Sequence, residues 1–126
     1  MIDLAAVELT LPSRAGPVAI LRGVDLSVGA GETVSLVGPS GSGKTSLLMV
    51  VAGLERATAG RVRVAGVDYA GRIEDALAAL RRESIGIVFQ DFHLVPTMTA
   101  QENVAIPLEL AGRRDAFNRA AAALES

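Results

Sequence analysis

The sequence predicts an α/β fold in which a small antiparallel β subdomain precedes a core of buried strands and helices. Segments 2–11 and 18–28 mix apolar and polar side chains in near-alternation, as half-exposed strands do, and a turn cluster separates them. Segments 33–37 and 85–89 are short apolar runs typical of buried parallel strands. Apolar residues at helical spacing fill the segments between and after these two runs.

The expected elements follow one another along the first half of the chain. The second strand would be bulged at Gly23, because glycine inside a strand often marks a bulge. An apolar run over 46–52 predicts a helix that stops at Gly53. Strict alternation over 61–64 predicts a further strand, which turns at Gly66.

The second half of the chain is predicted to be mainly helical. Residues 73–82 carry apolar side chains at helical spacing. Thr99 and Glu102 form a Thr-x-x-Glu capping box, and we expect Pro107 to bend the helix that this box opens. Asp115 is expected to cap a last helix, which continues to the end of the sequence.

Composition limits the classes of protein to which the chain can belong. Its 126 residues suit one domain, and since half are hydrophobic but only 3% aromatic, the core must be aliphatic. A net charge of −2 argues against nucleic acid as a partner. The absence of cysteine excludes disulfides and thiolate metal sites. We find no signal peptide, and no apolar run approaches the roughly 20 residues of a membrane span.

Residues 38–45 read Gly-Pro-Ser-Gly-Ser-Gly-Lys-Thr, which matches the full pattern G-x-x-x-x-G-K-[S/T]. Lys44 is the only lysine, and the rest of the 12 basic residues are arginine. The pattern lies between the predicted strand at 33–37 and the predicted helix at 46–52, which is the context that a phosphate-binding loop (P-loop) requires. A flexible Gly/Ser linker would lack these apolar flanks. The sequence therefore predicts a P-loop core that binds a nucleoside triphosphate.

Each residue type in this loop has a physical role. Gly41 and Gly43 can take backbone angles that let successive N–H groups converge on one anion, and the positive end of the following helix adds to the attraction. Lys44 would bridge the β- and γ-phosphates, and the Thr45 hydroxyl would ligate Mg²⁺. Pro39 has no N–H to donate and would stiffen the loop. The predicted nucleotide-binding residues are Gly38, Pro39, Ser40, Gly41, Ser42, Gly43, Lys44, Thr45 and Ser46.

Several motifs together resemble those of ATP-binding cassette (ABC) transporter ATPase subunits. They are the P-loop at 38–45, Gly-Leu-Glu at 53–55, Ile-Val-Phe-Gln at 87–90 and the stretch 94–104. The last stretch resembles the bacterial subgroup that includes lipoprotein-releasing and macrolide-export ATPases. The resemblance covers nearly the whole chain, and the order and spacing of its motifs are specific.

The resemblance implies ATP and Mg²⁺ as cofactors and gives Gln90 a role. In the family, the glutamine at this position touches Mg²⁺ and the attacking water, so Lys44 and Gln90 are the catalytic candidates. The residues that follow contact the membrane-spanning permease, which makes Phe92, Leu94 and Val95 a candidate docking loop, although an apolar cluster in a loop can also fill a core. The resemblance further implies a homodimer of ATPase subunits, lying in the cytoplasm on the inner face of the membrane, with no nucleic-acid partner.

Three motifs of the family do not occur here: the signature Leu-Ser-Gly-Gly-Gln, the apolar run that ends in Asp-Glu, and the switch histidine. We therefore expect a fragment with three parts: an antiparallel β subdomain (1–32), a P-loop core (33–90), and the glutamine loop (Q-loop) with a truncated helical subdomain (91–126). The parent would hydrolyse ATP to drive export or lipoprotein extraction. The fragment is expected to bind ATP without hydrolysing it.

Other features of the sequence bear on how adenine is held, on metal binding and on the class of P-loop protein. Leu11 stands where many cassettes stack the adenine on an aromatic side chain, so adenine would be held weakly. His93 is the sole histidine, and a metal role for it is not expected. A GTPase needs an Asn-Lys-x-Asp motif, which Lys44 cannot supply. A small-molecule kinase and a non-catalytic nucleotide-binding or interaction module remain as alternatives.

Overall fold

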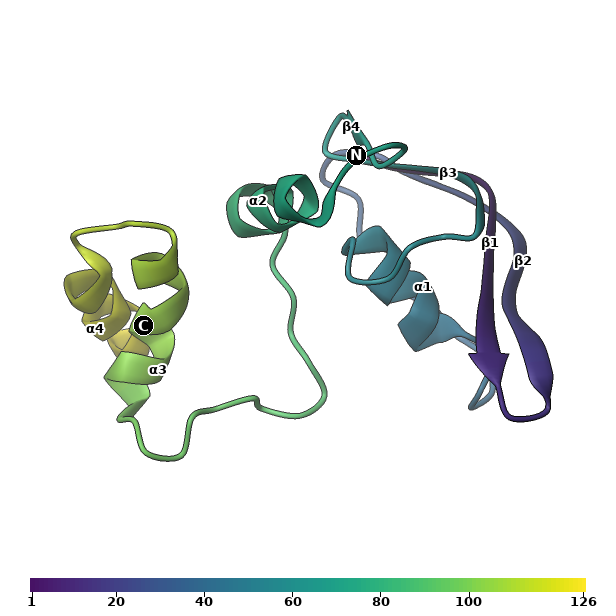
Figure 1. Ribbon diagram of the computed structural model, residues 1–126. Coiled ribbons are helices and arrows are strands. Elements are labelled where there is room, and N and C mark those ends of the chain that lie inside the picture. Colours follow the sequence, from purple (N-terminus) through teal and green to yellow (C-terminus); the bar gives the residue numbers. More distant parts are fainter. The chain divides into compact units, whose positions relative to one another are not determined.

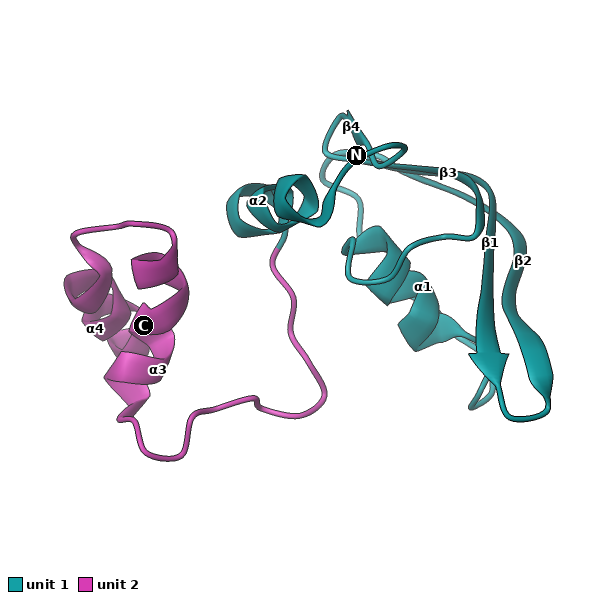
Figure 2. Cartoon of the chain, in the orientation of Figure 1, with its two compact units in different colours: residues 1–85 teal, residues 86–126 magenta.

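The computed structural model describes all residues, 1–126, and divides the chain into two compact units, Met1–Ile85 and Gly86–Ser126 (Figure 2). The elements of the first unit (Figure 1) are β1 (Ile2–Ser13), β2 (Gly16–Val28), α1 (Lys44–Val51), β3 (Ala59–Val64), β4 (Val67–Asp68) and α2 (Glu74–Ser84). The second unit contains α3 (Ala100–Leu110) and α4 (Ala116–Glu125). The predicted boundaries at 32 and 90 follow the subdomains that the family resemblance implies, which are not the same thing as compact units. These boundaries stay a prediction.

The strands form one antiparallel sheet in the order β2-β1-β3-β4. This confirms the two predicted antiparallel strands with a turn between them, and the strand predicted before Gly66. The bulge predicted at Gly23 is also confirmed: Val7 pairs with Val24 and Glu8 with Arg22, so Gly23 is the extra residue of β2. Its φ of +73° is open to glycine at little cost.

A second irregularity lies opposite, in β1. Two residues of β1, Ala5 and Ala6, lie opposite a single residue of β2, Asp25. The Asp25 carboxylate accepts a hydrogen bond of 2.8 Å from the Ala6 N–H. A Cβ on Gly60 of β3 would overlap the carbonyl of Ala6, so only glycine fits where β3 passes this point. Bulges bend a strand pair, and α1 lies inside the bend of the hairpin (Figure 1).

The core of the first unit lies between the sheet and α1. Alternate side chains of β1, β2 and β3 point to one face, as the period of a strand requires, and two α1 side chains pack against them. The buried members are Leu4, Val7, Leu9, Leu21, Leu47, Val50, Val62 and Val64. Packing on the sheet therefore holds α1, the helix that the P-loop opens, in place.

The two buried parallel strands predicted at 33–37 and 85–89 are not formed, and that prediction is wrong for this chain. Val37 is 90% exposed and Val88 is fully exposed. A central parallel strand obtains its hydrogen bonds and its burial from neighbouring strands and from helices on both faces. No segment of the chain pairs with either run, so local β propensity alone does not make them strands.

The second unit is a pair of helices with a small core of Ala105, Ala116 and Ala120. The capping box is confirmed: Thr99 Oγ1 accepts from the Glu102 N–H at 3.2 Å, and Glu102 Oε2 accepts from the Thr99 N–H at 2.6 Å. Helices in proteins depend on such caps because their first N–H groups have no intrahelical partner.

The helix α4 begins where predicted, but the expected cap is wrong. Asp115 precedes the helix, yet its side chain makes no capping hydrogen bond. Its carboxylate instead accepts a long contact of 3.4 Å from Arg113 Nε. The helices of the chain are all too short or too polar to cross a lipid bilayer.

The capping box predicts a pH dependence at the start of α3. Hydrogen bonds from the Thr99 backbone N–H and hydroxyl hold the pKa of Glu102 below its ordinary value of 4.5. Because the folded-state pKa is depressed, the stabilisation is complete above 4.5 and is lost as the pH falls through the folded pKa. The NMR shift of the Thr99 amide proton should therefore titrate with a midpoint below 4.5. The same titration in Glu102→Gln would contradict this assignment.

Candidate nucleotide-binding site

The P-loop runs directly into α1, which begins at Lys44. Gly41 and Gly43 both lie in the left-handed region, with φ of +79° and +87°, and Gly43 is the residue before the first turn of the helix. A Cβ on Gly43 would come within 3.1 Å of the Ile20 carbonyl oxygen and 3.2 Å of Leu21 Cδ2 in β2. Glycine is thus required at 43 both for its backbone angle and for the close approach of the loop to the sheet.

The N-terminus of α1 is free to bind an anion. The backbone N–H groups of Lys44, Thr45 and Ser46 donate to no other protein atom, and no side chain caps the helix. The first turn contains no acidic residue that would offset the positive end of the helix. Such a terminus attracts phosphate through both its N–H groups and its dipole.

The ammonium group of Lys44 is held within the loop. Its Nζ donates to the carbonyl oxygens of Gly38 and Pro39, at 2.9 Å and 2.7 Å, and to Ser42 Oγ at 3.3 Å. All three acceptors are neutral, and neither ion pair of the chain involves Lys44. The positive charge is therefore fixed in position but not compensated, which favours an incoming phosphate.

The other end of α1 is held by two residues, Tyr69 and Arg81, for which the sequence indicates no such role. The hydroxyl of Tyr69 donates to the Val51 carbonyl, and Arg81 Nη1 donates to the Gly53 carbonyl, both at 2.6 Å. Arg81 Nη2 also forms an ion pair with Glu74 at 2.6 Å. Burial raises the pKa of Tyr69, and the charge of Arg81 offsets part of that increase.

Arg81 lies in the last turn of α2, where a cation suits the negative end of its own helix. The same guanidinium also reaches the Gly53 carbonyl just beyond α1, where a cation is favourable too. Spacing along α2 could not indicate this second contact, because it depends on where α2 packs. The C-terminal end of the helix that carries the P-loop is thereby held.

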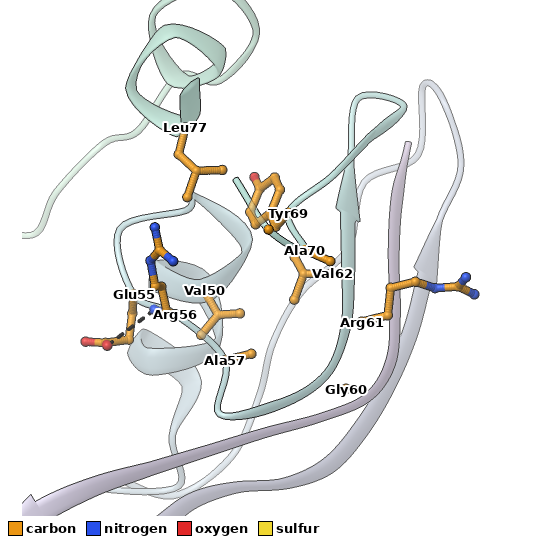
Figure 3. A pocket seen from close by; sticks show the side chains of 11 residues that line it. Val50, Glu55, Arg56, Ala57, Gly60, Arg61, Val62, Tyr69, Ala70 and Leu77 are labelled. Carbon is orange, nitrogen blue, oxygen red and sulfur yellow. Dashed lines mark hydrogen bonds between the residues drawn. The ribbon is translucent and has the colours of Figure 1, made fainter. Parts of the chain in front are cut away.

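A cavity of about 180 Å³ lies beside β3 and the C-terminal end of α1. Its apolar walls include Val50, Val62 and Leu77, while Arg61 points away from it (Figure 3). None of the predicted nucleotide-binding residues lines it. This cavity is therefore separate from the P-loop, and no sequence pattern indicated it.

The remaining predicted site residues belong to the second unit. Gln90 lies in a segment without regular structure and is exposed. Just before it, the ring of Phe89 meets the imidazole of His93 edge-on, with centroids 4.7 Å apart. The role of Gln90 at the nucleotide stays a prediction. Nowhere in the chain are three His, Cys, Asp or Glu side chains grouped so that they could hold a metal ion.

The predicted docking residues are at the surface of the second unit. Phe92 is 89% exposed, Leu94 63% and Val95 37%. These exposed apolar side chains are open to a partner. Their role in docking nevertheless stays a prediction.

Comparison with known proteins identifies the family. The family model described as "ABC transporter" matches residues 21–126. The lipoprotein-releasing system ATP-binding protein LolD of Anaeromyxobacter dehalogenans is 56% identical over 104 residues, which are 81% of this chain and 44% of that protein. The macrolide export ATP-binding/permease protein MacB of Escherichia coli K12 is 43% identical over 112 residues, 89% of this chain and 17% of that protein.

Solved structures agree with this assignment. The dimeric post-hydrolysis ATP-binding cassette MJ0796, bound to ADP and Pi, superposes with a TM-score of 0.90 at 35% identity, over 99% of this chain and 56% of that one. The predicted fold class, an α/β P-loop fold of the ABC-ATPase type, is thus confirmed. The chain spans less than half the length of the LolD relative. The chain belongs to the ABC transporter family.

Proposed function

We propose that the chain is the nucleotide-binding part of an ABC-type ATPase subunit and that it binds Mg-ATP through residues 38–46. One observation carries the proposal: a positive charge without a carboxylate partner, that of Lys44, lies in a glycine loop at an uncapped helix N-terminus. These features together favour a polyphosphate over other anions, because several donors and a fixed ammonium face one region. Titration of residues 1–126 with Mg-ATP tests the proposal directly.

Mg²⁺ fits the residues at the start of α1. The Thr45 hydroxyl is exposed and makes no hydrogen bond to the protein, and it is an oxygen donor of the kind that Mg²⁺ prefers. When bound, the ion would neutralise charge on the phosphates. Thr45 would hold it from the helix, while Gln90 would orient water from the Q-loop.

The parent protein is proposed to act as a homodimer that hydrolyses ATP for a membrane-spanning permease. The relatives are named for lipoprotein release, pyoverdine export and macrolide export, and the MJ0796 structures are described as dimeric. We therefore propose export, or extraction of lipoproteins or lipids, as the process that ATP drives. The subunit would lie at the cytoplasmic face of the membrane, bound to its permease.

The docking loop gives a separate prediction. Replacing Phe92, Leu94 or Val95 by Asp should weaken capture of the permease portion of E. coli MacB in detergent by at least about tenfold, since a buried interface position does not tolerate an unpaired charge. Affinity for Mg-ATP should stay nearly unchanged. Leu124→Asp, an exposed apolar position at the end of α4, is the matched control. Full capture by all three loop variants would exclude docking through this loop.

A further inference from the structure

The side-chain amide of Asn103, in the second turn of α3, lies within hydrogen-bonding distance of four backbone atoms of residues 95–99. Its Oδ1 accepts from the Val95 N–H at 2.7 Å. Its Nδ2 lies 3.2 Å from the Val95 carbonyl oxygen, 3.2 Å from that of Met98 and 2.9 Å from that of Thr99. One side chain thus holds both backbone polar groups of Val95, much as a neighbouring strand would.

The loop has few other restraints. Residues 86–94 make no backbone hydrogen bond, so Val95 is the first residue of this segment that α3 holds. A turn follows, closed by a 3.1 Å hydrogen bond from the Met98 N–H to the Val95 carbonyl, with Pro96 at the position that such turns favour. The path of the chain from the docking residues into α3 therefore depends on Asn103.

Asparagine is well suited to this position. Its amide offers an acceptor and two donors at the end of a short side chain. Aspartate keeps the acceptor but would bring a negative charge against three carbonyl oxygens. Leucine has a similar shape but no polar atom, and it is the better helix former of the two. The intrinsic preferences of α3 do not account for an asparagine at this position.

We infer that Asn103 is a positioning residue for the docking loop: it holds Val95 in the conformation that presents Phe92, Leu94 and Val95 to a membrane-spanning partner. The inference rests on the proposed docking function. It adds that the orientation of the loop is set from the first two turns of α3, so the capping box and Asn103 act on the same stretch of chain. Thr99 and Glu102 close the helix end, while Asn103 fixes the loop that leads into it.

Hydrogen exchange and permease capture, measured on the full chain, test this inference. In Asn103→Leu, exchange of the Val95 amide should accelerate about fivefold, the effect of losing one net hydrogen bond of about 1 kcal/mol. Exchange within α3 should not accelerate, because leucine favours the helix. In the same variant, capture of the permease portion of E. coli MacB should fall. Asn103→Asp should also weaken capture, because it loses both N–H donors and places a negative charge near three carbonyl oxygens.

Gln101→Leu is the matched control. It removes a side-chain amide from the same helix, but that amide donates to the Phe117 carbonyl at 3.1 Å and does not contact the loop. Unchanged Val95 exchange in Asn103→Leu would overturn the positioning role. Faster exchange with full capture, while Phe92→Asp abolishes capture, would show that docking does not need this restraint. If capture survives in Phe92→Asp as well, the docking function itself is wrong, and the inference fails with it.

Discussion

Replacing Lys44 with alanine is expected to lower the affinity of the chain for Mg-ATP by about 10²–10⁴-fold, as the loss of two charge-assisted hydrogen bonds implies. The ammonium is the only basic group within the loop, and neutral acceptors hold it in place. Removing it leaves the β- and γ-phosphates with backbone N–H donors alone. Titration calorimetry on residues 1–126 measures the loss.

Two further variants separate charge from shape. Lys44→Arg keeps the charge but presents a wide planar fork where a compact ammonium fits between loop carbonyls, so it should also bind poorly. Arg14→Ala removes an exposed positive charge from the turn between β1 and β2, and it should leave the affinity unchanged. Circular dichroism of each variant shows whether it is folded. Wild-type affinity in Lys44→Ala would refute the P-loop assignment.

The chain by itself is expected to bind ATP without turning it over. Phosphoryl transfer needs a carboxylate that holds Mg²⁺, an oriented nucleophile and stabilisation of charge on the γ-phosphate at the same time. The family resemblance supplies those carboxylates from an Asp-Glu motif that this sequence lacks. Of the acidic residues present, Asp91 follows Gln90 directly, and Glu102 is engaged in the capping box.

The expected rate of ATP turnover is so low that it has to be compared with a blank. Loss of a general base alone commonly costs about 10²–10⁴ in rate, which takes the 1–100 s⁻¹ typical of kinases down to about 10⁻⁴–1 s⁻¹. Because the carboxylate that holds Mg²⁺ is lost as well, we expect less than about 10⁻² s⁻¹. A steady-state phosphate-release assay on the purified chain, with Lys44→Ala as the blank, gives the value. Turnover near 1 s⁻¹ that disappears in Lys44→Ala would mean that the chain carries a complete catalytic site of another kind.

Much of the candidate site could be predicted from the sequence because its physics is local. The P-loop depends on glycine backbone angles and a helix terminus within one stretch of the chain. Gly41 and Gly43 have the left-handed backbone angles, and Gly43 directly precedes the first turn of α1. The capping box joins Thr99 to a residue three positions away. Gly23 indicated a bulge because a glycine inside an alternating strand often marks one.

Only the tertiary structure decided the features that depend on neighbours far along the chain. The runs at 33–37 and 85–89 have the composition of buried strands, but a parallel strand exists only where others supply its hydrogen bonds and cover its faces. Contacts made by Arg81 with the end of α1, and by Asn103 with Val95, likewise depend on how elements pack or turn back. The sequence by itself determined the phosphate-binding loop, whereas packing decided which residues hold it and which apolar runs remain exposed.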